Sequence, residues 1–182
     1  MIKMPEMLLI AGTGRNSGKT TLACKLIKKI SAGCPVVALK ITPHFHQDYG
    51  NGKVIIESDD LVIIEEVNPG TGKDSSLMLK AGAAKSYFVM AKDEQLKEAF
   101  ELIIKQLPTK TPIVCESGGL RYFVEPGAFL MMNRIENKTC KEGIEMLIGI
   151  ADQRITFDGN NIDFDLNLIS YSGNKWKIKK EK

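Results

Sequence analysis

A glycine-rich stretch near the start of the chain, GTGRNSGKTT at residues 12–21, contains the residue types that bind phosphate groups. Glycines let backbone N–H groups approach an anion closely, because no Cβ atom stands in the way. Lys19 can offset the charge of terminal phosphates, and the hydroxyl of Thr20 can coordinate Mg²⁺. The strict pattern G-x-x-x-x-G-K-[ST] would place a glycine at Thr13, whereas the glycines here flank that position.

The segments on either side of this stretch favour a phosphate site over a glycine turn with an incidental lysine. The apolar run Met7–Ala11 predicts a buried strand that leads directly into the glycines. From Gly18 onward, apolar residues recur at helical spacing, which predicts an amphipathic helix that ends near Gly33. The positive end of that helix dipole would face a bound anion. We therefore predict that a nucleotide contacts Gly14, Arg15, Asn16, Ser17, Gly18, Lys19, Thr20 and Thr21.

Three further residues could take part in the same chemistry. Glu116 ends an apolar stretch, where phosphate-loop proteins place an acid that holds Mg²⁺; capping the glycine turn that follows is its other candidate role. Asp74 could ligate Mg²⁺ or cap the helix predicted at Ser75–Ala83. Lys40 ends the strand predicted at Pro35–Ile41, at the sheet edge where open α/β sheets bind ligands, unless it is a plain surface lysine. The candidate catalytic residues are Lys19, Lys40 and Asp74, and the candidate Mg²⁺ ligands are Thr20 and Glu116.

The only histidines, His44 and His46, are spaced so that they would face one side of an extended segment. With Asp48 they could bind a metal ion, or they could act as acid–base groups near neutral pH. Two ligands do not close a metal site. Substrate contact or a place in an exposed loop is therefore the interpretation that we favour.

Strands and helices alternate along most of the chain, which predicts an α/β fold with a mainly parallel sheet and helices on both faces. The later elements expected from the pattern are two strands joined by Asp59–Asp60, strands at 86–91, 112–116 and 129–133, and helices at 96–107 and near 141–150. Turns at 158–159 and 172–174 predict a closing antiparallel meander. We expect one domain over 1–182, with 153–182 as a C-terminal β extension.

Composition sets further limits on function. The 182 residues are 43% hydrophobic and 26% charged, which suits one domain with a substantial core. The net charge is +3, and four lysines lie in the last six residues, so no basic face for nucleic acid is expected. Four cysteines without a C-x-x-C pair indicate a reducing, cytoplasmic setting. The apolar run at the start is too short for a signal peptide or a membrane span.

The spacing of the glycine stretch is similar to that of a known group of proteins. Counted from Gly12 to Gly18, it has six steps, as occurs in P-loop proteins related to MinD-type ATPases, dethiobiotin synthetase and cobyrinate amide synthases. The signature lysine of MinD-type proteins would fall at Gly14, and Arg15 is a candidate substitute. The segment ESGGL at 116–120 resembles a glutamate–glycine segment of the two synthetase families.

Within this group the chain most resembles the molybdopterin-guanine dinucleotide biosynthesis protein B family. The similar segments are NSGKTTL at 16–22, LKITPHFH at 39–46 and NPGTGKDSSLMLKAGAAKSYFV at 68–89. The resemblance covers residues 7–89 well and the rest thinly, and the predicted C-terminal meander matches neither pattern. It implies that Lys40 contacts a phosphate or an acidic substrate, and that Asn133 and Arg134 lie where related proteins contact the nucleotide base.

The resemblance implies a P-loop nucleoside triphosphate hydrolase fold that binds GTP or ATP with Mg²⁺. Slow hydrolysis is expected, since no clear catalytic base or arginine finger stands out in the sequence. The expected role is that of an accessory protein in molybdenum cofactor biosynthesis, acting as a homodimer with a partner protein of that process. A second hypothesis is an ATP-dependent ligase like dethiobiotin synthetase, with a substrate carboxylate held near Lys40 and phosphorylated by ATP. A third is a nucleotide-sensing regulator without chemistry of its own. No nucleic acid or membrane partner is expected.

Overall fold

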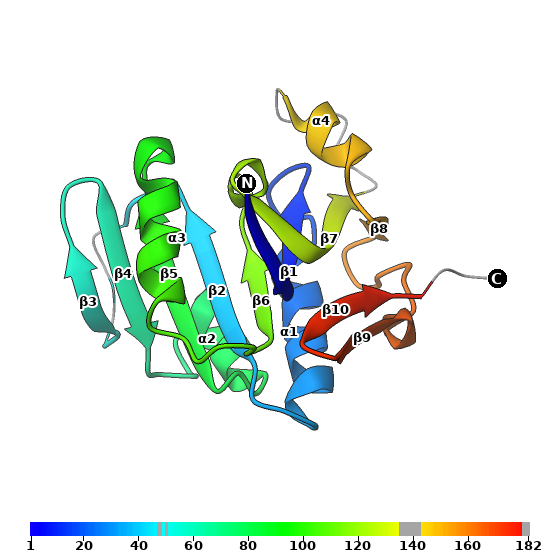
Figure 1. Cartoon of the computed structure of the whole chain (residues 1–182), viewed down its shortest axis with the longest axis horizontal. Coiled ribbons are helices and arrows are strands. Elements are labelled where there is room, and N and C mark those ends of the chain that lie inside the picture. The colour runs from blue at the N-terminus through cyan, green and yellow to red at the C-terminus, as the bar shows by residue number, and fades with distance from the viewer. Residues whose placement is uncertain (47–48, 50, 135–142, 180–182) are drawn as a thin grey trace.

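The computed structural model describes residues 1–46, 49, 51–134 and 143–179. Its centre is an eight-stranded sheet with the strand order β3-β4-β5-β2-β6-β1-β7-β8 (Figure 1). The strands are β1 (Ile2–Gly12), β2 (Val37–Thr42), β3 (Lys53–Glu57), β4 (Leu61–Glu66), β5 (Lys85–Ala91), β6 (Ile113–Glu116), β7 (Val124–Arg134) and β8 (Gln153–Phe157). The helices are α1 (Lys19–Ser31), α2 (Asp74–Lys80), α3 (Leu96–Ile104) and α4 (Ile144–Gly149), with short 3₁₀ turns η1 (Asp93–Gln95), η2 (Leu120–Tyr122) and η3 (Leu166–Leu168).

The sheet is mostly parallel. Neighbouring strands run in the same direction from β5 through β2, β6, β1 and β7 to β8. At the opposite edge, β3 and β4 form an antiparallel hairpin that turns at Asp59–Asp60 and joins the sheet through β4. The predicted α/β class with a mainly parallel sheet is confirmed.

Helices cover both faces of the sheet, because successive residues of a buried strand point to opposite sides. On one side, Leu8 and Ile10 of β1 belong to the apolar core that includes Leu22 and Leu26 of α1 and part of α2. On the other, Leu9 shares a core with residues of α3, α4 and η2. Each such fully buried aliphatic side chain contributes about 1.5–3 kcal/mol, so the two cores hold α1 and its preceding loop firmly on the sheet.

The C-terminal part differs from the predicted antiparallel meander. β8 pairs in parallel with β7 and is the edge strand of the main sheet. Only β9 (Ile169–Ser172) and β10 (Lys175–Ile178) form an antiparallel hairpin, which is separate from the main sheet. Ile155 and Phe157 of β8 are buried while Arg154 is exposed, so this edge strand shows the same alternation as an antiparallel strand.

The observed helix boundaries lie close to the predicted ones. The helix expected at 75–83 begins at Asp74 and ends at Lys80. The helix expected near 141–150 is α4, and residues 141 and 142 lie outside the described part of the chain. Across the ranges that the structure covers, every helix is too short or too polar to cross a membrane.

Candidate functional site

The candidate site lies where the parallel strands β1, β2 and β6 end, next to the start of α1 (Figure 1). The strand register brings its residues together. Lys40 of β2 pairs directly with Glu116 of β6, and Ile10 of β1 pairs with Glu116 from the other side. The carboxyl edge of an open parallel sheet is the usual place for ligands of α/β proteins. Residues far apart in the sequence therefore meet here.

The loop between β1 and α1 depends on two glycines. Gly18 has φ +83°, a left-handed conformation that glycine adopts without strain, and it stands immediately before α1. A Cβ atom at Gly18 would also lie 2.6 Å from the ring of Phe157. A Cβ atom at Gly12 would lie 2.5 Å from Oγ of Ser17. The loop closes tightly because neither position carries a side chain.

Thr13 explains why the loop departs from the strict spacing. Its backbone N–H donates to the carbonyl of Met132 at 2.9 Å, which continues the pairing of β1 with β7 by one residue. Its hydroxyl is 3.0 Å from Oδ1 of Asn133 and is turned toward β7. The tight part of the loop therefore starts at Gly14. Asn133, which the resemblance places where related proteins contact the nucleotide base, accepts this hydrogen bond.

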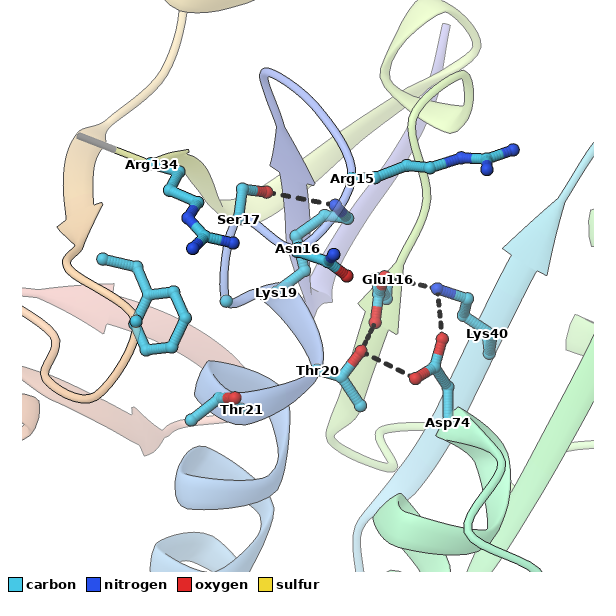
Figure 2. A pocket seen from close by; sticks show the side chains of 13 residues that line it. Arg15, Asn16, Ser17, Lys19, Thr20, Thr21, Lys40, Asp74, Glu116 and Arg134 are labelled. Atoms are coloured by element: carbon cyan, nitrogen blue, oxygen red, sulfur yellow. Dashed lines mark hydrogen bonds and ion pairs between the residues drawn. The ribbon is translucent and has the colours of Figure 1, made fainter. Parts of the chain in front are cut away.

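Lys19 curls back over the loop from the first position of α1 (Figure 2). Its ammonium donates to the carbonyl of Gly14 at 2.8 Å and to Oγ of Ser17 at 3.1 Å. Ser17 in turn donates to the same carbonyl at 3.1 Å. Arg15 is exposed and extends away from this ring of contacts. The ammonium of Lys19 thus lies close to the helix N-terminus, where its positive charge and the helix dipole would both attract an anion.

Thr20, Asp74, Glu116 and Lys40 form a single polar cluster beside the loop (Figure 2). The Thr20 hydroxyl is 2.8 Å from Oε2 of Glu116 and 3.0 Å from Oδ1 of Asp74. The other carboxylate oxygens face Lys40, whose ammonium is 2.8 Å from Oδ2 of Asp74 and forms an ion pair with Glu116. The four residues come from α1, α2, β6 and β2, and each of the two carboxylates contacts both the Thr20 hydroxyl and the Lys40 ammonium.

The cluster contains two acidic side chains and one basic side chain. The side chain of Glu116 is 2% exposed and that of Lys40 is 16% exposed. Burial alone would lower the pKa of Lys40, but the neighbouring carboxylates of Glu116 and Asp74 outweigh it and leave the pKa above its usual value. The charged lysine therefore faces two acidic groups. Since Thr20 has one hydroxyl proton, it can donate to only one of them at a time.

These contacts decide between the alternative roles of two acids. The residue before α2 is Lys73, and no side chain caps this helix, so Asp74 points into the cluster rather than acting as the cap. The turn after β6 is held by Ser117, whose hydroxyl accepts the N–H of Leu120 at 3.2 Å. Capping roles for Asp74 and Glu116 are therefore wrong, and both carboxylates serve the cluster.

The donor set suits Mg²⁺. Thr20, Asp74 and Glu116 offer only oxygen atoms, and Mg²⁺ is usually held by one or two carboxylates, with water and phosphate oxygens completing the shell. Over the ranges described, no three His, Cys, Asp or Glu side chains are grouped to hold a metal by themselves. A divalent ion here would therefore depend on the hydroxyl of Thr20 and on a phosphate ligand.

The two histidines lie apart from this cluster. Both are exposed, and the ring of His46 stacks on Phe88 at 6.5 Å between centroids. His44 faces a second cavity described below. Asp48, the third member of the metal site considered from the sequence, lies outside the described residues.

The loop and the cluster line a cavity of about 560 Å³, which we call the first cavity. It contains all the predicted site residues from Arg15 to Thr21 together with Lys40, Asp74 and Glu116. Arg134, Phe157 and Gly159, which follow or end the last strands of the sheet, complete its wall. Of these, sequence reasoning missed Phe157 and Gly159, because only the parallel pairing of β8 with β7 brings them to the loop.

Comparisons of this chain with protein-family models, with curated proteins and with solved structures found no match.

Proposed function

We propose that the chain is a P-loop nucleotide-binding protein that holds the phosphates of GTP or ATP, with Mg²⁺, in the first cavity. The observation that carries this proposal is the position of Thr20. It is the second residue of a helix that begins directly after a glycine loop, and its hydroxyl contacts both Asp74 and Glu116. In phosphate-loop proteins, this hydroxyl and an acid at a strand end are the groups that hold Mg²⁺.

The other residues of the first cavity would contact different parts of the nucleotide. Backbone N–H groups of the loop and the N-terminus of α1 favour phosphate oxygens. Lys19 would exchange its contacts with the loop for the terminal phosphates and offset their charge. Bound Mg²⁺ would supply neutralisation of the phosphate charge. Arg134 and Phe157 line the same cavity and would contact the ribose or the base.

Slow hydrolysis follows from the contacts of the acids. A catalytic base must be able to accept a proton from the attacking water. Glu116 and Asp74 each contact Lys40 and Thr20, and both would hold Mg²⁺ in the proposed complex, so neither would be free to act as the base. We therefore assign the protein to binding with slow turnover, and the family resemblance supports an accessory role in molybdenum cofactor biosynthesis.

An ATP-dependent ligase of the dethiobiotin synthetase type is a second candidate. One observation favours it: Lys40 and Glu116 line a second cavity as well as the first, so another substrate could lie beside the terminal phosphate. Preference for ATP with ADP released only in the presence of a second substrate would support the ligase. Preference for GTP without such stimulation would support the accessory role.

Calorimetric titration with Mg·ATP and Mg·GTP tests the proposal directly. Lys19→Ala should weaken binding about 10- to 100-fold, the effect of losing a hydrogen-bonded charge contact. Lys25→Ala is the matched control, because Lys25 is an exposed lysine of the same helix. If neither nucleotide binds the wild-type protein, or if Lys19→Ala binds as well as wild type, the assignment of the site is wrong.

A further inference from the structure

A second cavity adjoins the first one and differs from it in chemistry. Its volume is about 590 Å³, within the range of small-molecule sites. Much of its wall is apolar and comes from β2, β5, η2, α3 and α4. The apolar residues that line it are Ile41, Ala91, Leu96, Tyr122, Ile144 and Leu147.

The charged residues of the second cavity gather where it meets the first. Four charged residues line both cavities: Arg15, Lys19, Lys40 and Glu116. A fifth, Asp93, lines only the second cavity. Three cationic groups thus face two acidic ones. The residues that the two cavities share form the cationic end, and the rest of the wall is apolar side chains together with glycines and the polar residues Thr42, His44, Asp93 and Ser117.

Lys40 lines both cavities, so its positive charge can act on a ligand in either one. Its ammonium is held by Asp74 at 2.8 Å and by an ion pair with Glu116, on the side of the cluster. While it neutralises these carboxylates, it contributes little net attraction to an anion in the second cavity. A divalent cation held by Thr20 and the same carboxylates would repel the ammonium and replace its neutralising role.

We propose that the second cavity binds a small anionic molecule with an apolar body, and that its affinity rises when Mg²⁺ and a nucleotide occupy the first cavity. This inference rests on the proposed function. The anionic group lies against Lys40 and Arg15, and the apolar body packs between Leu96, Tyr122 and Leu147. The coupling follows from charge: Mg²⁺ takes over the carboxylates, and Lys40 then serves the second ligand.

The ligand class follows from the walls. Arg15, Lys19 and Lys40 would repel a cation. A fully polar molecule would gain nothing from the apolar side chains of the wall. A carboxylate and a phosphate monoester are both compatible with the cationic end, because each can accept hydrogen bonds from Lys and Arg. Hexanoate and hexyl phosphate are therefore the two probes, with hexylamine as their cationic counterpart.

The test uses the full chain with the first cavity filled by Mg·ADP or Mg·GDP, whichever binds more tightly by calorimetry. Methyl NMR of labelled isoleucine and leucine then locates each probe. We expect at least one anionic probe to shift the methyl signals of Ile144 and Leu147, and to bind about tenfold or more weakly when EDTA removes Mg²⁺. The two probes separate a carboxylate ligand from a phosphate one.

Two variants separate charge recognition from folding. Lys40→Gln should abolish the Mg²⁺-dependent gain in probe affinity. Tyr122→Glu places a negative charge on the wall at a side chain that is 48% exposed, so it should weaken the anionic probes without unfolding the chain. Met146→Glu is its control, because Met146 is 54% exposed on α4 and does not line the cavity.

The outcomes are distinguishable. If Mg·ADP and Mg·GDP both fail to bind, the proposed function and this inference are both overturned. If either binds but no probe shifts the methyl signals, this inference alone is overturned. It is also overturned if probe affinity is the same with EDTA, or if hexylamine binds as well as the anions, since charge would then play no part.

Discussion

Lys40 and Glu116 stand side by side in register on β2 and β6 and form a buried ion pair on the wall shared by the two cavities. Backbone pairing fixes the distance between them, so the pair does not depend on a flexible loop. Removing one partner of a buried pair costs more than the pair itself contributes, because the remaining charge is left without compensation. Here Asp74 provides a second partner for Lys40.

Glu116→Gln should reduce the effect of Mg²⁺ on nucleotide affinity by about tenfold or more, the size seen when groups around a metal are altered. The substitution keeps the shape of the side chain and removes its charge. Calorimetry of the diphosphate nucleotide with Mg²⁺ and with EDTA measures the effect. Glu125→Gln, an exposed acid on β7, should leave it unchanged. Equal Mg²⁺ dependence in Glu116→Gln and wild type would exclude Glu116 from the metal site.

Thr20→Ala should lose the same Mg²⁺ dependence, whereas Thr20→Ser should keep most of it, because serine restores the hydroxyl that contacts Asp74 and Glu116. Thr109→Ala is the control, since Thr109 is exposed and lines neither cavity. The measurement is the Mg²⁺ concentration that gives half of the nucleotide affinity gain. A serine variant as weak as the alanine variant would argue that the methyl group, not the hydroxyl, matters at this position.

Gly18→Ala should destabilise the fold by about 1–3 kcal/mol, through the left-handed backbone and the contact with Phe157. Urea unfolding of the nucleotide-free protein measures this change. Gly149→Ala should stay within about 0.5 kcal/mol of wild type, because a Cβ atom there meets no neighbour within 4 Å. Should Gly18→Ala prove as stable as wild type, the loop must be able to adopt a second conformation.

Cys24 should be alkylated about 10- to 100-fold more slowly than an unfolded thiol at pH 8, since thiolate is the reactive form. Burial, together with the nearby charges of Asp74 and Glu116, raises the pKa of Cys24 from 9.0 to about 11. The protonated thiol is favoured in the folded chain, so its contribution to stability is complete below pH 9 and is lost as the pH rises toward 11. Peptide mapping after timed iodoacetamide treatment reports the rate, and denatured protein gives the reference. Equal rates in the two samples would show that Cys24 is not protected.

Much of the architecture could be predicted from local sequence patterns. Buried parallel strands read as continuous apolar runs, and α1 and α3 show clear helical spacing, so the order of strands and helices was correct. The pairing of β8 could not be predicted, because an edge strand that is buried on one side alternates like an antiparallel one. Strand order in the sheet is set by packing across the whole molecule, which local patterns do not record.

Part of the candidate site could likewise be predicted from local sequence, and part could not. Residue types and spacing along one segment predicted the glycine loop, Lys19 and Thr20. The meeting of Lys40, Asp74 and Glu116 arises from the register of β2 with β6 and from the position of α2, so the sequence could only suggest each residue separately. The contact of Thr13 with Asn133 could not be predicted, because no pattern in the sequence indicates that the Thr13 hydroxyl turns toward β7.

The hairpin of β9 and β10 has a consequence for synthesis of the chain. Trp176 donates its indole N–H to the carbonyl of Glu6 at 2.8 Å, a hydrogen bond that spans 170 residues, and Lys29 of α1 donates to the carbonyl of Ile169 at 3.0 Å. The strand and helix that carry the glycine loop are therefore translated well before the hairpin that packs against them. During synthesis, β1 and α1 would therefore lack these two contacts until β9 and β10 have emerged from the ribosome.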